Sequence, residues 1–224
     1  MATSAFDIKE VFSLGWEAFK KNALILIILL IISLVAALIS AIILTVLNIP
    51  SIISFILSTA VNSYFMLSIL RASLAASNEE TPSWSVLKNG LPLFLKFFIV
   101  GIIFMLIPTA ARIFPISLVL IIIFVILVFF VVSIFFPAPY ILANKPETGI
   151  IDAFKISWMI TAKNLSAIIP YMFLWAIILA ASSIPLGLGL LISVPAFCVS
   201  LAYVYKKLDA SVFSSAEIEA QPVE

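Results

Sequence analysis

The sequence predicts an all-helical integral membrane protein that crosses a bilayer six times and keeps both termini in the cytoplasm. Three observations lead to this fold class. The 224 residues are 64% hydrophobic and 10% charged, whereas soluble chains are about half apolar and a quarter charged. Six apolar runs are each long enough to cross the hydrocarbon core of a bilayer. Basic residues are confined almost entirely to one side of these runs.

The predicted spans are Ala23–Leu47, Ser51–Leu70, Leu91–Ala111, Pro115–Phe136, Leu165–Ala181 and Ile184–Tyr205. The first run is well above the about 7–15 residues of a signal-peptide core, so we expect an uncleaved helix. Pro50 ends it, because proline lacks an N–H and clashes with the preceding turn. The apolar stretch from 165 to 205 is too long for one span. A tight hairpin at Ser182–Pro185 is therefore expected.

The distribution of charge predicts the orientation. With six spans, eleven of the twelve basic residues lie on the side of the termini, and Arg112 lies alone on the other. Because basic loops stay in the cytoplasm, the termini are expected there, in a multi-pass protein of the plasma (inner) membrane. Lys96 sits slightly inside the third run and is expected to extend back to the headgroups. The remaining inner basic residues are Lys9, Lys20, Lys21, Arg71, Lys88, Lys145, Lys155, Lys163, Lys206 and Lys207.

Residues 5–21 are predicted to form an amphipathic helix on the inner membrane surface. Ile8, Phe12 and Trp16 recur on one face at helical spacing, with charged residues on the other face. Ser4, followed by Asp7, resembles a capping box. Residues 149–163 form a rougher second copy, and the middle loop holds a third, irregular one around Trp84.

These copies predict an internal repeat. Trp16, Lys21 and Asn22 align with Trp158, Lys163 and Asn164 at a constant offset, and Trp84, Lys88 and Asn89 follow the same order. We infer three parallel repeats, about 5–70, 82–140 and 149–208, each an interfacial segment followed by a helical hairpin. They form one membrane domain, 1–208, before a tail (209–224) that is expected to be disordered. The alternative is that Trp and Lys simply anchor any membrane interface.

Two groups of motifs carry a family resemblance. The first comprises 138–143, 152–158 and Lys163-Asn164; the second comprises 184–195 and Ala202-Tyr203. Together they resemble a family of bacterial polytopic membrane proteins of largely unknown function. This family includes the membrane domain fused to glycerophosphoryl diester phosphodiesterases. The resemblance implies a polytopic helical fold over most of the chain. The phosphodiesterase domain has no counterpart here, so none of its chemistry transfers.

The composition argues against catalysis. The chain has no histidine, the commonest general base and metal ligand. The predicted spans carry no acidic residue, and no phosphate-binding or metal-ligand spacing occurs. Cys198, the single cysteine, lies in an apolar run and is expected to be a small buried hydrophobe. We therefore expect no enzyme, no cofactor and no metal site, and a net charge of +1 gives no bulk attraction to nucleic acid.

One polar track interrupts the apolar spans. Ser51, Ser54, Ser58 and Asn62 share a helical face of the second span. These residues could line a pore or a solute path. We favour the alternative, in which they mediate helix packing. Pro185, Gly187, Gly189 and Pro195 likewise predict either a broken transporter-like helix or, preferably, a hairpin and a kink.

The functional expectation is a non-catalytic protein that organises the bilayer or docks partners through its cytoplasmic interfacial helices. Membrane lipids are the expected partners, while a cytoplasmic protein partner and a homo-oligomer both stay open. A channel or facilitator for a small or lipidic solute is the alternative, which a water-filled cavity lined by Asn62 would favour. The expected lipid or partner contacts are Trp16, Lys20, Lys21, Trp84, Lys88, Trp158 and Lys163.

Overall fold

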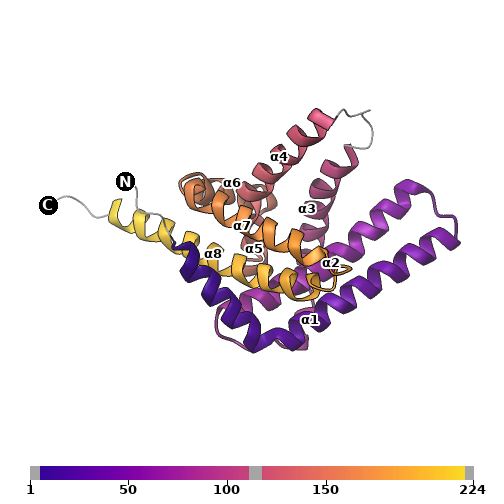
Figure 1. The fold of residues 1–224 in the computed structure, drawn as a ribbon, viewed down its shortest axis with the longest axis horizontal. Helices are drawn as coiled ribbons and strands as arrows, with labels where there is room; N and C mark the ends of the chain where they lie inside the picture. The colour runs from indigo at the N-terminus through magenta and orange to yellow at the C-terminus, as the bar shows by residue number, and fades with distance from the viewer. Residues whose placement is uncertain (1–5, 111–117, 220–224) are drawn as a thin grey trace.

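The computed structural model of the chain describes residues 6–110 and 118–219, and its regular elements there are helices (Figure 1). Five helical segments in this part of the chain are long and apolar enough to cross a membrane. The predicted class of an all-helical membrane protein agrees with this architecture. The helices are α1 (Ile8–Val46), α2 (Ser51–Ser77), the 3₁₀ helix η1 (Trp84–Leu87), α3 (Leu91–Ala110), α4 (Leu118–Phe135), α5 (Pro137–Asn144), α6 (Ile150–Ala162), α7 (Leu165–Ser183) and α8 (Leu190–Glu219).

Helix α1 differs from the prediction of a separate interfacial helix that ends at residue 21. It is one continuous helix through Asn22, although Figure 1 shows it changing direction along its length. At a rise of about 1.5 Å per residue, its 39 residues extend about 58 Å, nearly twice the thickness of a hydrocarbon core. No Gly or Pro interrupts residues 16–46, so backbone hydrogen bonding carries the helix through the expected break.

Helix α2 begins at the predicted Ser51 but continues past Leu70 to Ser77. The predicted span ends at Leu70, before the charged Arg71, whereas the helix extends seven residues further. The structure instead buries Ala72, Ser73 and Leu74 against other helices. Small side chains that permit close packing therefore extend this helix into the inner part of the molecule.

The last two spans are joined by a compact turn, as predicted, but the turn lies slightly later. Helix α7 ends at Ser183 and α8 begins at Leu190. Leu186 and Gly187 both have positive φ angles, of 53° and 77°, which favour glycine. A Cβ atom on Gly189 would lie 2.6 Å from the Ser182 carbonyl oxygen, so this approach also requires glycine. Pro195 lies inside α8 without ending it.

Two segments outside the predicted spans are helical. The predicted span ends at Phe136, but residues 137–144 form α5, with Pro137 in its first turn, where a missing N–H costs little. Helix α5 is a core element, with Ala138, Ile141 and Leu142 buried. Helix α8 continues to Glu219 through the tail that was expected to be disordered. No proline or glycine lies between 206 and 219 to stop it.

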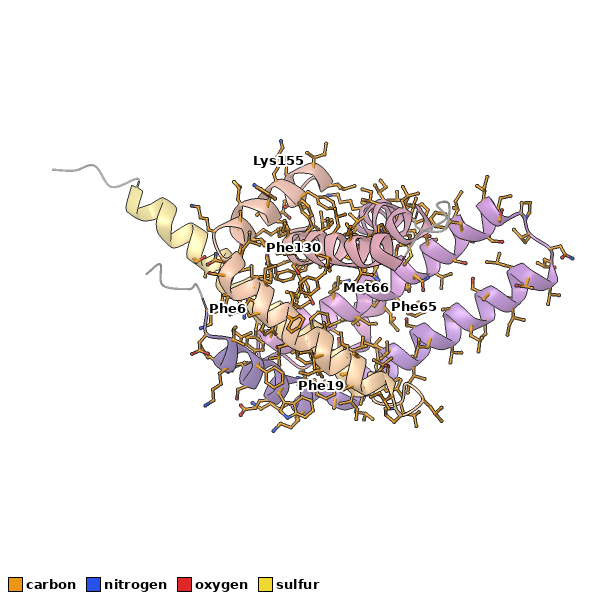
Figure 2. All side chains as sticks on the ribbon, turned by 45° about the horizontal axis from the view of Figure 1, so that its top comes forward. Phe6, Phe19, Phe65, Met66, Phe130 and Lys155 are labelled. Carbon is orange, nitrogen blue, oxygen red and sulfur yellow. The ribbon has the colours of Figure 1, made fainter. Side chains whose placement is uncertain are left out.

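The core lies where α1, α2 and α8 pack together, with α5, α6 and α7 against them. The far ends of α1 and α2 form a hairpin that extends away from this core in both views (Figures 1 and 2). Its surface is apolar: Leu38, Val46 and Ile52 are 61%, 71% and 72% exposed. Soluble monomers rarely expose such a continuous apolar surface, whereas lipid covers it in a membrane protein.

Candidate membrane-interface site

The first interfacial segment begins at Asp7, one of the two residues of the predicted capping box. The Asp7 Oδ1 atom accepts hydrogen bonds from the backbone N–H groups of Lys9 (2.7 Å) and Glu10 (3.3 Å). Asp7 is thus the N-cap itself, a position that favours short polar side chains. Ser4, the predicted cap, lies outside the described residues.

The two segments predicted to lie at the membrane interface, 5–21 and 149–163, present the same face to the protein. Every position from 8 to 19 is as exposed, half-buried or buried as the position 142 residues later, in 150–161. Val11 and Gly15 are buried, as are Ala153 and Ser157. The charged residues of both segments are exposed. An anchoring tendency of Trp and Lys alone does not require this full correspondence of buried positions.

The aligned asparagines also behave alike. The Asn22 side chain donates a hydrogen bond to the carbonyl of Ala18, and the Asn164 side chain donates to the carbonyl of Ile160, both at 3.0 Å. The surroundings differ, since Asn22 is half-buried inside α1 and Asn164 is buried between α6 and α7. The predicted bend thus coincides with a helix break at the second asparagine only.

Gly15 brings α1 into close contact with α8. A Cβ atom at this position would lie 2.7 Å from the Cα atom of Ser200. The Ser200 hydroxyl is buried, shares a hydrogen bond with the Tyr171 hydroxyl and lies 3.5 Å from the Val11 carbonyl oxygen. This contact joins the first interfacial segment to the last hairpin of the chain.

The corresponding residue of α6, Ser157, makes a similar contact with α4, where its hydroxyl donates to the carbonyl of Ile134 at 3.1 Å. In the middle segment, the Asn89 side chain donates to the Ser68 hydroxyl of α2 at 3.0 Å and accepts from Arg71 at 2.8 Å. Each interfacial segment therefore packs on the second helix of the preceding predicted repeat. The first segment packs on the last, which closes a ring.

Several inner lysines are engaged within the protein. Lys145 forms an ion pair with Asp209 at 3.0 Å, which joins α5 to α8. Lys207 pairs with Glu10 at 2.9 Å, and Lys206 donates to the Ser77 carbonyl. Lys96, expected to reach the headgroups, instead donates to the carbonyls of Pro146 (2.6 Å) and Thr148 (2.8 Å) and ties α3 to the α5–α6 turn.

The predicted contact residues remain at the surface. Trp16, Trp84 and Trp158 are 39%, 50% and 52% exposed, while Trp175, which no interfacial segment contains, is 2% exposed. Lys20, Lys21, Lys88 and Lys163 are exposed, as are Lys9 and Lys155. Lys155 forms a 3.9 Å ion pair with Asp152. Sequence reasoning missed the buried Tyr140 of α5, whose hydroxyl donates to the Cys198 carbonyl at 2.7 Å.

The polar track of α2 does not converge on an interior path in the described part of the chain. Ser51 and Asn62 are exposed on the outside of the helix, and Ser54 and Ser58 are half-buried. The Ser54 hydroxyl donates to the Ile49 carbonyl of the preceding turn. Cys198 is buried, as predicted. Arg112, the predicted outer charge, lies outside the described residues, and among those described no cluster of metal-ligating side chains occurs.

Comparison with known proteins assigns no family. No protein-family model, no curated protein and no solved structure matches the chain. The functional argument therefore rests on the geometry of the interfacial segments.

Proposed function

We propose that the chain is a six-span protein built from three repeats, with both termini in the cytoplasm. Helix α3 is the sixth span in this proposal. Its 20 residues extend about 30 Å, the thickness of a hydrocarbon core, and Lys96 is the only charged residue among them. The matched burial of 8–19 and 150–161, the paired asparagine bonds and the closed ring of contacts support the repeat.

The function that these features support best is organisation of membrane lipids by the cytoplasmic interfacial segments, without catalysis. The observation that carries this proposal is that six lysines and three tryptophans of these segments are each exposed at the surface of the protein. Tryptophan prefers the headgroup level, and each basic residue near an anionic leaflet contributes about 1 kcal/mol of attraction. Neighbouring acidic residues, such as Glu10 and Asp152, reduce the total attraction of these lysines to an anionic leaflet. A cytoplasmic protein partner that binds the same surface is compatible with this proposal.

The test compares lipid enrichment around two variants. The full-length protein is reconstituted in phosphatidylcholine vesicles that contain phosphatidylglycerol, and the lipids that co-purify are quantified. Wild-type protein should be enriched in phosphatidylglycerol, whereas the triple variant Lys20→Gln, Lys21→Gln, Lys163→Gln should lose this enrichment and still insert. Asn62→Leu is the control and should retain it. An unchanged triple variant, together with loss of solute flux in Asn62→Leu, would refute the proposal and favour a facilitator.

Orientation is tested separately by cysteine labelling in a Cys198→Ala background. Cysteine at exposed Asn78 should react with an impermeant reagent only from the cytoplasmic side, and cysteine at Arg112 only from outside. Labelling of position 78 from outside would reverse the proposed orientation, which rests on the eleven-to-one distribution of basic residues.

A further inference from the structure

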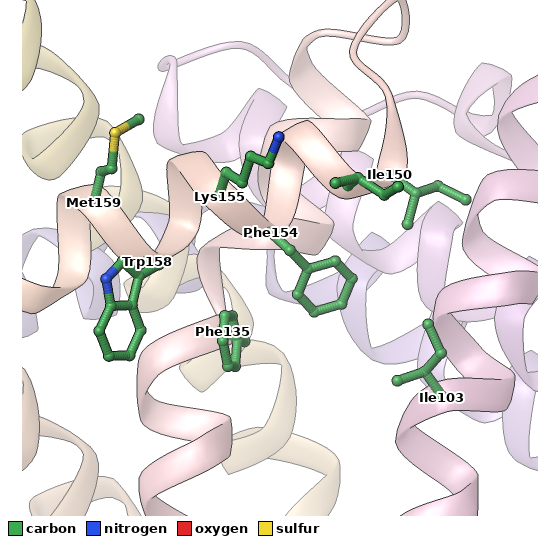
Figure 3. A pocket seen from close by; sticks show the side chains of 8 residues that line it. Ile103, Phe135, Ile150, Phe154, Lys155, Trp158 and Met159 are labelled. Carbon is green, nitrogen blue, oxygen red and sulfur yellow. The ribbon is translucent and has the colours of Figure 1, made fainter.

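An apolar groove of about 640 Å³ lies beneath α6, between α3 and α4 (Figure 3). Phe154 and Trp158 point into it from α6, Phe135 lines it from α4, and Ile103 lines it from α3. Its volume is in the range of about 300–1,000 Å³ typical of small-molecule sites. Among the described residues that line it, Lys155 is the only charged one, and its ammonium group points away from the aromatic side chains.

The groove exists because Phe154 holds the two helices apart at this level. Its ring lies 6.4 Å from that of Phe104 on α3 and 5.4 Å from that of Phe135 on α4, measured between centroids. Trp158 packs on Phe135 at 6.4 Å and forms the next part of the roof.

The equivalent position in the first repeat is filled by the protein itself. Phe12 corresponds to Phe154, and its ring lies 5.3 Å from the buried indole of Trp175, which in turn lies 5.3 Å from Phe197. The large Trp175 side chain therefore occupies the space between that interfacial segment and α7–α8. The space beside the interfacial segment is therefore filled in the first repeat, at Phe12, and forms a groove at the equivalent Phe154.

We propose that the open groove binds one acyl chain of an inner-leaflet phospholipid, with the lipid phosphate beside Lys155. A hydrocarbon chain matches the apolar walls, because removing its methylene groups from water is favourable. Lys155 precedes Trp158 by three residues on α6, and tryptophan prefers the level where headgroups meet hydrocarbon. The ammonium group is exposed, and its ion pair with Asp152 is long enough for a phosphate to compete. This inference rests on the proposed membrane orientation but not on enrichment of anionic lipids.

The experiment uses phosphatidylcholine with a photoreactive diazirine on its acyl chain. Full-length protein is reconstituted in phosphatidylcholine vesicles with a trace of this lipid and irradiated, and the labelled residues are mapped by mass spectrometry. Labels should concentrate on Ile103, Phe135 and Phe154, above the level at lipid-exposed Ile177 of α7. A uniform distribution around the apolar surface would overturn the proposal, whatever the variants show.

Two pairs of variants sharpen the test. Ile103→Trp, which mimics the filling by Trp175, should abolish groove labelling, and the matched Ile177→Trp should leave it intact. Lys155→Gln should lower labelling at limiting probe by about fivefold, the equivalent of about 1 kcal/mol, whereas Lys9→Gln in the closed copy should not. Unchanged labelling in folded Ile103→Trp would overturn the acyl-chain site, and unchanged labelling in Lys155→Gln would overturn the phosphate contact. Because the probe is zwitterionic, a failure of the phosphatidylglycerol test does not affect these results.

Discussion

Gly15→Ala is predicted to destabilise the protein, although alanine is the better helix former. The added Cβ atom would lie 2.5 Å from the Ser200 Oγ atom and 2.7 Å from the Ser200 Cα and Cβ atoms. The hydroxyl can rotate, but the Cα atom moves only if α8 moves. Overpacking costs about 1–3 kcal/mol, and the contact with backbone places this site toward the upper end. Alanine recovers about 1 kcal/mol of helix propensity, so we expect a net loss of about 1–2 kcal/mol.

The assay is thermal unfolding of the purified protein in one detergent, followed by tryptophan fluorescence. A loss of 1 kcal/mol lowers the Tm of a chain of this size by about 2–4 °C. Gly101→Ala is the matched control inside a helix. The Cβ atom added at position 101 would clash with the Ser63 hydroxyl alone. Because the Ser63 Cβ atom is 3.6 Å away, that hydroxyl can rotate aside. The control should keep or raise the Tm. An equal rise in Gly15→Ala would refute the close approach of α1 to α8.

Two further predictions concern matched positions. Asn164→Ala should lower the free energy of unfolding by about 1–2 kcal/mol, because it removes a buried hydrogen bond. Asn22→Ala should leave stability nearly unchanged, because improved helix propensity inside α1 offsets the lost hydrogen bond. Equal losses in thermal unfolding would contradict this difference in setting. Trp175→Ala should lower the free energy of unfolding by about 3–5 kcal/mol, because it opens a cavity in the core. Trp158→Ala, at a half-exposed surface site, should change it by only about 0.5 kcal/mol. A large loss in Trp158→Ala would place that side chain in the core instead.

The elements that the sequence predicted well are those specified by local patterns. Ser51, Leu91 and Leu165 begin helices as expected, because each opens a long apolar run after a polar or proline-containing break. The helix over 150–162 was found from its amphipathic spacing. Helix α5 was missed, because Pro137 and a polar flank resemble a loop. Its burial depends on α2 and α8, which are distant in the sequence.

The candidate site divides in the same way. The exposed tryptophans and lysines follow from composition and charge, so the sequence predicted their chemical character. The ring of contacts between interfacial segments and preceding hairpins was not predictable, since it joins residues such as Gly15 and Ser200 from opposite ends of the chain. The groove beneath α6 depends on a difference between two copies that the alignment of their interfacial segments does not reveal.

The sequence by itself determined the helical class and the starts of several long apolar helices, because backbone hydrogen bonding and the apolar length of a run are local properties. Tertiary structure decided which lysines are engaged, as Lys145 is by Asp209, and which stay exposed, as Lys155 does. It also decided that Trp175 fills the space beside Phe12, whereas the corresponding groove beneath α6, lined by Ile103, stays open. The physical reason is that side chains fill space only against partners brought together by the whole fold.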